Sequence, residues 1–388
     1  MRYHDAPKFP RGFRCASRNC GLKPSANDLA LFVSDVDAAA AAVFTRNQFP
    51  GAPITLGRET IRGRRLRAIV ANSRYSNVAT GPVGLEHARR MASAAAAELD
   101  TSADRVLVSS TGVIGVQLPI ELIERGIRGM SADLQDDPIV GVRGIMTTDT
   151  YPKALSASVG DATITWVAKG SGMIEPNMAT MLSYIFTDAA MGAEALDGIL
   201  RRAVDVSFNM LSVDSDTSTS DTCAILANGR AGAVDAAAFE EALTVGCVRM
   251  AEMLARDGEG AKHLLRAIVR DAASASDAKQ IAKSLVNSPL IKTMIFGADP
   301  NVGRLLMAVG KCFDCVIPAE STDAWINGHA VVQGGRRLEF DDATVRQALK
   351  AEVVDIEVSL GAGSAGATAY GCDLTQGYID ENAAYYSS

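Results

Sequence analysis

Long apolar runs are absent from this 388-residue sequence, and aromatic side chains are scarce. No stretch approaches the roughly 18 consecutive apolar residues that a transmembrane helix needs, so we expect none. The chain begins Met-Arg-Tyr-His-Asp without an apolar segment, which gives no indication of a signal peptide. Only 5% of the residues are aromatic although 48% are hydrophobic, which is typical of an alanine- and valine-rich globular core. We therefore expect a soluble protein of the cytoplasm.

An excess of positive charge is also missing. The chain has 38 Lys and Arg against 45 Asp and Glu, a net charge of −7. This balance argues against a nucleic-acid partner or an anionic membrane. No internal repeat, heptad pattern or low-complexity tail is present. The length would allow two or three domains, although a large α/β fold can hold it in one.

Cysteines are few and odd in number. Seven cysteines in a long chain without a signal segment favour reduced thiols in a cytoplasm. Cys312 and Cys315 have CxxC spacing, and Cys15 with Cys20 could complete a tetrathiolate zinc site. Neither pair has a regular second knuckle, however, and Cys312 lies in an apolar run that favours a helix, where buried thiols are ordinary. We therefore predict no zinc site at these cysteines.

Apolar segments with strand and helix periods alternate along the chain, which predicts a mixed α/β class. The topology does not follow from this alternation. We expect strands at residues 29–33, 41–45, 64–72, 105–109, 162–169, 181–187, 353–360 and 365–375, and helices at residues 85–99, 194–206, 236–255, 277–286 and 301–309.

Residues 169–187 are the stretch around which the chain is organised. The first half is glycine-rich, and residues 181–187 form an apolar, β-branched and aromatic run that predicts a buried strand. Ala179 and Thr180 stand just before that strand. If the peptide bond before Thr180 were cut, its free α-amine could act as base for its own hydroxyl, with a reference pKa of about 7.7–8.0. On the residues alone, a plain glycine loop entering a core strand is the favoured interpretation.

Two other positions have a chemical and a plain interpretation. The turn at residues 110–112 follows a predicted strand, and its backbone amides and the Thr111 hydroxyl could receive an oxyanion; it could also be only a turn. Glu259 lies just after the helix predicted at residues 236–255, where Gly258 would end it. It could point into a cleft or simply be a solvated charge.

A family resemblance favours the chemical interpretations. The string KGSGMIEPNMATML, residues 169–182, resembles the processing site of the ornithine acetyltransferase (glutamate N-acetyltransferase) family, whose precursors cleave themselves before this threonine. Further blocks resemble that family in the same order, so the resemblance covers nearly the whole chain: residues 109–115, 145–150, 214–222, 257–261, 287–293, 299–301, 310–312 and 370–375.

The resemblance implies a fold and an assembly. It implies a layered α/β/β/α-type sandwich, formed by an α chain of residues 1–179 and a β chain of residues 180–388 from one self-cleaved precursor. The two chains are expected to stay together as an (αβ)2 heterotetramer. The cleavage site would be the Ala179–Thr180 bond.

The resemblance also implies an activity and its residues. The acetyl group of N2-acetylornithine would pass to Thr180 as an acyl-threonine and then to glutamate, without metal or coenzyme. Thr111 and Gly112 match the oxyanion-hole pair of the family. The positions that match substrate-binding residues are Thr147, Lys169, Thr180, Glu259, Asn382 and Ser387.

Several positions depart from the usual residues of the family, so the substrate pocket is less well defined than the nucleophile: Arg74, Tyr75, Glu175, Lys262, His263, Val302, Tyr386 and Ser387. An acyltransferase with a different, specialised substrate therefore stays open. A hydrolase resembling the β-peptidyl aminopeptidases, in which water takes the acyl group, also stays open. A catalytically lapsed member is disfavoured because Thr180 and the Thr111–Gly112 turn are present. We find no motif for acetyl-CoA.

Overall fold

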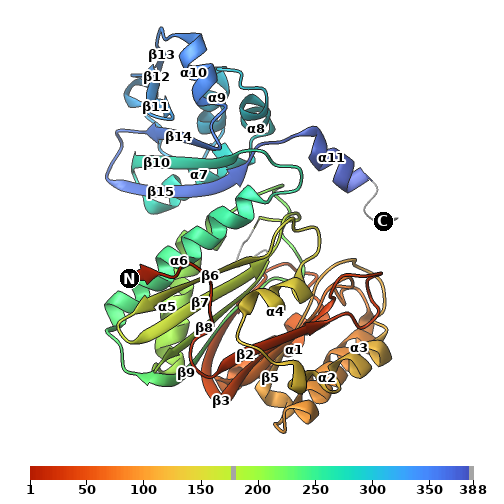
Figure 1. Ribbon diagram of the computed structural model, residues 1–388. Helices are drawn as coiled ribbons and strands as arrows, with labels where there is room; N and C mark the ends of the chain where they lie inside the picture. The colour runs from red at the N-terminus through yellow and green to blue at the C-terminus, as the bar shows by residue number, and fades with distance from the viewer. Residues whose placement is uncertain (176–180, 384–388) are drawn as a thin grey trace. The chain divides into compact units, whose positions relative to one another are not determined.

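The computed structural model describes residues 1–175 and 181–383, which form two compact units (Figure 1). Within the described residues, the first unit comprises Met1–Gly170, 181–209 and Thr217–Met250. The second unit comprises Ser171–Glu175, Met210–Asp216 and 251–383. Each unit has a β-sheet covered by helices, so the predicted mixed α/β class is confirmed.

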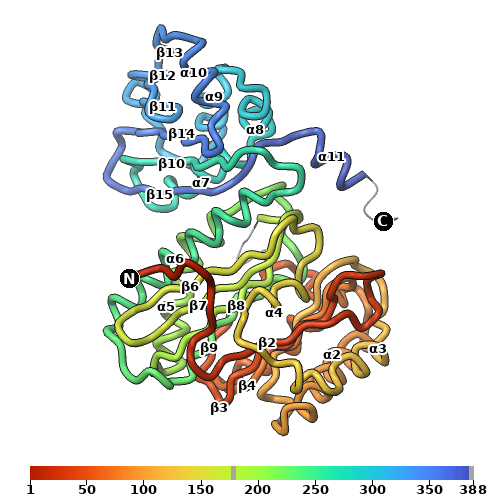
Figure 2. Tube along the Cα trace, in the orientation of Figure 1, coloured from red at the N-terminus to blue at the C-terminus, as the bar shows by residue number. Residues whose placement is uncertain are grey.

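The first unit contains a nine-stranded sheet in the order β1-β6-β7-β8-β9-β3-β4-β5, with β2 paired to β3. Figure 2 shows how this order brings the early strand β3 beside the much later β9. The strands are β1 Arg2–Tyr3, β2 Phe13–Arg18, β3 Leu29–Phe44, β4 Arg65–Asn72, β5 Val106–Ser110, β6 Lys153–Val159, β7 Ala162–Lys169, β8 Leu182–Ala189 and β9 Thr222–Gly232.

Strand β3 corrects the expectation of two strands at residues 29–33 and 41–45. It runs unbroken over 16 residues. Its first part pairs with β2 and β4, its last part pairs with β9, and the register against β4 shifts between Val33 and Ala38. Asp35 lies within the strand. Its backbone N–H donates to the Gly12 carbonyl at 2.8 Å, and its carboxylate pairs with Arg230, at 2.6 Å between Oδ2 and Nη2. One strand therefore joins two parts of the sheet.

These two parts of the sheet pack face to face. Alternate residues of β3 point to opposite sides, and Phe32 lies in one apolar cluster with Tyr184 and Phe186 of β8. The ring centroids of Phe32 and Phe186 are 5.5 Å apart in a stacked arrangement. Leu31 points the other way, into a cluster with α2 (Gly81–Glu98) and α3 (Ile120–Ile127).

Helices close the other side of the first unit. In α6 (Ala236–Arg256), a side chain in place of Gly246 would overlap the ring of Trp166 on β7, so the helix lies directly against that strand. Helix α5 (Ala193–Val206) contacts β3. The first unit therefore has the α/β/β/α layers implied by the resemblance.

Strand β8 lies in the interior of this sandwich. It pairs antiparallel with β7 and parallel with β9, and all eight of its residues are buried. Burying side chains such as Tyr184, Ile185 and Phe186 contributes about 1.5–3 kcal/mol each. The strand predicted at residues 181–187 is confirmed, with a shift of one residue at its start.

The second unit contains a six-stranded sheet in the order β13-β12-β11-β14-β10-β15. Helix α7 (Ala275–Asn287) packs on it, with Ile281, Leu285 and Val286 buried. Strand β10 is central, parallel to β14 and antiparallel to β15. The strands are β10 Leu264–Ala272, β11 Asp323–Ile326, β12 His329–Gln333, β13 Arg336–Arg337, β14 Val353–Ser359 and β15 Ala365–Cys372.

The helices also differ in part from the expectation. Helix α2 begins four residues before the predicted start. Six helices of the described residues were not predicted: α1, α3, α4, α8, α10 and α11. Cys312 lies beyond the end of α9 and not inside a helix, although it is buried as expected. No helix among the described residues is long and apolar enough to span a bilayer. The remaining helices are α1 Ala52–Thr60, α4 Pro138–Ile145, α7 Ala275–Asn287, α8 Pro289–Phe296, α9 Gly303–Gly310, α10 Asp342–Ala348 and α11 Gln376–Ala383.

Candidate active site

The turn after β5 holds the predicted oxyanion residues in place. The Thr111 N–H donates to the Asn72 carbonyl at 3.0 Å, and the Val113 N–H donates to the Arg74 carbonyl at 2.8 Å. The Ser110 hydroxyl also donates to the Asn72 side-chain oxygen at 2.6 Å. The turn is therefore bound to the last residue of β4 and to the residues directly after it.

Gly112 is required by this packing. Its φ is 123°, in a region that side chains rarely adopt, and a Cβ there would overlap the Arg74 carbonyl. Among residues 1–175 and 181–383, neither the Gly112 N–H nor the Thr111 hydroxyl has a hydrogen-bond partner. Two donors on one rigid turn are thus available for an oxygen that gains negative charge.

A second group of the first unit brings Thr147 and Lys169 together. The Lys169 ammonium donates to the Thr147 hydroxyl at 3.2 Å. Asp149 and Lys153 form a fully buried ion pair at 2.6 Å. Asp149 also accepts from the Gly170 N–H at 2.7 Å. Burial alone would raise the pKa of Asp149, but Lys153, Lys169 and the Gly170 amide lower it below the ordinary value. The carboxylate is therefore charged. Its hydrogen bonds hold the backbone at Thr147 and directly after Lys169.

Lys169 ends β7 beside the start of β8. Its ladder partner is Leu182, which also pairs with Thr222 of β9. The sequence places Thr180 two residues before Leu182. Thr180 and Ala179 themselves lie outside the described residues.

In the second unit, Glu259 and Asn382 come together although 123 residues separate them. The Asn382 side-chain amide donates to Glu259 Oε2 at 2.8 Å. The Glu259 N–H donates to the Ser171 carbonyl at 2.9 Å. A Cβ at Gly172 would overlap the Glu259 carboxylate, so this carboxylate lies directly against the glycine. Ser387 lies outside the described residues.

The departures near Glu259 have structural partners. The Lys262 ammonium lies 5.5 Å from the centre of the Phe296 ring, and no ion pair joins Lys262 to Glu259 in the described part of the chain. The backbone N–H groups of Lys262 and His263 both donate to Asp373 Oδ1. Val302 is buried at the start of α9, and Tyr386 falls outside the residues that the structure describes.

The prediction missed two charged groups. The pair Asp149–Lys153 has i,i+4 spacing, but a polar loop gave no reason to expect its complete burial. Glu175, noted only as a departure, forms an ion pair with Lys283 at 3.2 Å. It also accepts from Asn287 at 2.6 Å. No spacing in the sequence indicated contacts over more than 100 residues.

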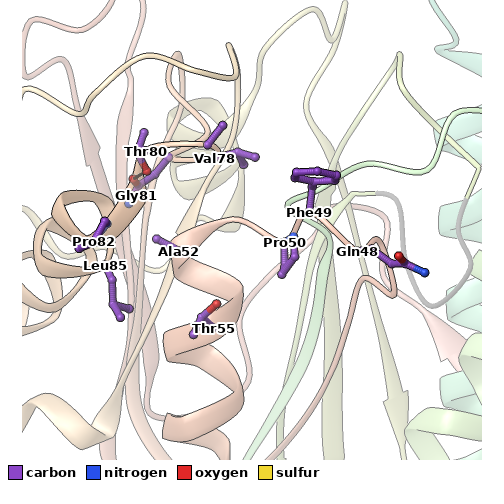
Figure 3. A pocket seen from close by; sticks show the side chains of 12 residues that line it. Gln48, Phe49, Pro50, Ala52, Thr55, Val78, Thr80, Gly81, Pro82 and Leu85 are labelled. Carbon is purple, nitrogen blue, oxygen red and sulfur yellow. Dashed lines mark hydrogen bonds between the residues drawn. The ribbon is translucent and has the colours of Figure 1, made fainter.

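A pocket of about 410 Å³ lies elsewhere in the first unit. Figure 3 shows Phe49 and Pro50 on one side of the first turn of α1, and Pro82 and Leu85 on the other. No predicted site residue lines it. Within the described residues, no three or more His, Cys, Asp or Glu side chains cluster as metal ligands would.

Comparisons with known proteins match nearly the whole chain. The model of the ArgJ family matches residues 14–387. The chain is 45% identical to "Arginine biosynthesis bifunctional protein ArgJ 2" of Clostridium acetobutylicum, over 97% of this chain and 98% of that protein. It is 40% identical to "Glutamate N-acetyltransferase Oat2" of Streptomyces clavuligerus, over 98% of each.

A solved structure is also similar. It is an arginine biosynthesis bifunctional protein ArgJ from Bacillus halodurans, with 36% identity and a TM-score of 0.51. The match covers 52% of this chain but 98% of that chain, so the solved chain is about half as long.

Proposed function

This chain belongs to the ArgJ family, and on that premise we propose that it moves an acetyl group from N2-acetylornithine to glutamate. It is an acetyltransferase of arginine biosynthesis, as its relatives at 40–45% identity over nearly their full length are named. The mechanism rests on the turn at residues 110–112. Its two hydrogen-bond donors, the Thr111 hydroxyl and the Gly112 N–H, donate to no described residue.

The nucleophile in this proposal is Thr180. Cleavage of the Ala179–Thr180 bond gives residues 1–179 and 180–388 and frees the Thr180 α-amine. A solved relative whose chain is about half as long supports a precursor that is cut near its middle. The amine takes the hydroxyl proton while the hydroxyl oxygen attacks the acetyl carbonyl of the donor.

The remaining steps follow from the charges that form. The tetrahedral oxyanion accepts hydrogen bonds from Thr111 and Gly112, and ornithine leaves with the proton that the Thr180 amine held. The glutamate amine then attacks the acetyl ester. The carbonyl oxygen again becomes an oxyanion at the same position, and the Thr180 oxygen leaves and regains its proton from the attacking amine. The bonds and protons of the two steps balance without metal or coenzyme.

Substrate binding uses groups of opposite charge. Lys169 and the Thr147 hydroxyl hold a carboxylate of the amino acid, and the buried Asp149 fixes their positions. Glu259, supported by Asn382, holds the ammonium of the ornithine side chain. Ser387 completes the set of substrate-binding residues that the resemblance implies.

The experiment that tests the function follows both products. Purified enzyme is given N2-acetylornithine with a labelled acetyl group and an excess of glutamate. We expect labelled N-acetylglutamate and ornithine in equal amounts. Labelled acetate as the main product would identify a hydrolase, and no ornithine at all would exclude this donor.

The assembly and the location extend the proposal. We propose an (αβ)2 assembly, to be measured by light scattering of the purified protein. The proposed location of the protein is the cytoplasm, which the seven free cysteines favour.

A further inference from the structure

Glu175 is one of the departures from the usual residues of the family, and its carboxylate contacts polar side chains from three positions of the second unit. It pairs with the Lys283 ammonium at 3.2 Å. It also accepts hydrogen bonds from the Asn287 amide at 2.6 Å and from the Ser212 hydroxyl at 3.1 Å. The Lys283 and Glu175 side chains are only 17% and 21% exposed, so water and salt screen this ion pair weakly.

The backbone at Glu175 and just before it is also fixed. The N–H groups of Met173 and Ile174 donate to the two oxygens of the Asp214 carboxylate, at 2.6 Å and 2.8 Å. The Glu175 N–H donates to the Asp216 carbonyl at 3.0 Å. Met173 has a φ of 53°, which side chains rarely adopt and which persists only where surrounding contacts impose it. The segment is therefore held both by its backbone and by the Glu175 side chain.

These contacts join the two sides of the proposed cleavage site. Thr180 follows Glu175 by five residues in the sequence. Residues 173–175 precede the cleavage site, whereas the partners named above follow it, at positions 212–216, 283 and 287. The contacts thus connect the last part of one proposed chain to the other chain.

We propose that Glu175 is a positioning residue for the self-cleavage before Thr180. Its contacts with Lys283, Asn287 and Ser212 anchor the segment that leads to the cleaved bond. The inference rests on the self-cleavage in the proposed function, and it adds a residue that sets the rate of that step.

A reaction within one chain depends on the position of the reacting atoms. In the cleavage, the Thr180 hydroxyl oxygen bonds to the Ala179 carbonyl carbon, the peptide C–N bond breaks, and the hydroxyl proton passes to the released amine. Water then hydrolyses the ester to the Ala179 carboxylate and the free hydroxyl. The oxygen must approach the carbonyl carbon to about 3–3.5 Å, and an anchored segment reaches that geometry more often. Loss of the anchor therefore slows the cleavage without changing the groups that react.

The experiment follows processing as it occurs. The full-length chain is made by cell-free translation with labelled methionine, and the uncut fraction is measured over time on a denaturing gel. Glu175→Gln keeps the shape and can still accept from Asn287 and Ser212, but it loses the charge that faces Lys283. We expect the rate constant of processing to fall about tenfold. Glu175→Ala, which loses all these side-chain contacts, should be slower still.

Glu357→Gln is the matched control. Glu357 on β14 pairs with Arg270 at 2.9 Å in the same unit, and its side chain is 24% exposed against 21% for Glu175. The same charge is lost from a similar ion pair, so the processing rate should stay unchanged. Both substitutions are also made in the uncut Thr180→Ala chain, whose urea unfolding midpoints show that each variant is folded under the assay conditions.

Ser212→Ala is a milder second variant, because it removes one donor to Glu175 and no charge. It should slow processing about threefold, and it decides the test if Glu175→Gln does not fold. An unchanged rate in Glu175→Gln, or an equal slowing in Glu357→Gln, would overturn the inference. If only Ser212→Ala folds, an unchanged rate in that variant overturns it.

Failure of the proposed function gives a different result. Processing needs no substrate, so a chain that is cut but transfers no acetyl group would overturn the function and leave the comparison of rates valid. A chain that transfers the acetyl group but is cut equally fast with and without the Glu175 charge would overturn the inference alone. An unmodified chain that stays uncut would overturn both the self-cleavage and the role of Glu175.

Discussion

At the scale of single residues, the Thr111 hydroxyl makes no hydrogen bond to any described residue, and the backbone of its turn is fixed. The hydrogen bond that we propose from Thr111 to the substrate is needed mainly when the carbonyl oxygen becomes an anion. A group of this kind contributes to turnover more than to affinity.

Replacement of Thr111 by alanine should therefore lower kcat about a hundredfold, or roughly 2.7 kcal/mol, with little change in KM. Steady-state kinetics with N2-acetylornithine and glutamate measure this. Thr111→Ser keeps the hydroxyl and should retain most of the activity. An unchanged rate in Thr111→Ala would assign Thr111 to turn structure alone.

Glu259 is the residue proposed to bind the donor ammonium. Glu259→Gln keeps the shape and the contact with Asn382 but removes the charge. The KM for N2-acetylornithine should rise by a factor that corresponds to a loss of about 1–3 kcal/mol in binding free energy, the usual loss for a charge-assisted bond. A neutral N-acetyl analogue should be affected much less. Equal losses for the two donors would contradict the ammonium-binding role.

The Glu259 prediction has one structural support. A salt bridge to Lys262 would have offset the charge of Glu259, but the Lys262 ammonium lies over the Phe296 ring instead. The variant should therefore change recognition without breaking an ion pair between these two residues.

At the scale of elements, the turn after β5 depends on two glycines in different ways. Gly112 has a φ of 123°, and a Cβ there would overlap its neighbours. Gly115 has a φ of 84°, and a Cβ there would have no atom within 4 Å. Gly112→Ala should move the turn away from residues 72–75 and abolish activity.

Gly115→Ala is the matched control. It should cost about 1–2 kcal/mol from its left-handed backbone alone and leave most of the activity. Activity assays together with urea unfolding of both variants separate the effects. Full activity in Gly112→Ala would show that the turn tolerates displacement and that its geometry is not needed.

The sequence predicted those elements whose apolar pattern is long and uninterrupted. Residues 162–169 and 181–187 correspond to β7 and β8 with shifts of two residues at most. The expected break in β3 was wrong because β2 and β4 pair with the first part of the strand and β9, far away in the sequence, pairs with its last part. Strands β11 and β12 are too short for a periodic signal, whereas β10 alternates and could have been predicted.

The site was predictable only in part for the same reason. The motif at residues 110–112 predicts an oxyanion turn, and that role stays a prediction. The fixation of the turn by Asn72 and Arg74 depends on sheet neighbours, which the motif does not show. The contact of Glu259 with Asn382 spans 123 residues. No spacing rule reaches that far, so only the resemblance indicated that these residues act together.

At the scale of the whole molecule, the proposed α and β chains share one sheet. Strand β8, from residues 180–388, pairs with β7 from residues 1–179, and β9 pairs with β3. Separating the chains would expose the buried edges of these strands. The two compact units divide the sequence differently from the proposed cleavage, since both chains contribute to the first unit. The chains should therefore co-purify without a disulfide.

The measurement that tests the central claim most directly is the intact mass of the purified protein under denaturing conditions, for the unmodified sequence and for Thr180→Ala. The account predicts two chains, residues 1–179 and 180–388, from the unmodified sequence. It predicts one uncut chain of about 40.7 kDa from the variant. Cleavage of the Thr180→Ala variant at the same bond would contradict the account, because an external protease and not Thr180 would then make the cut.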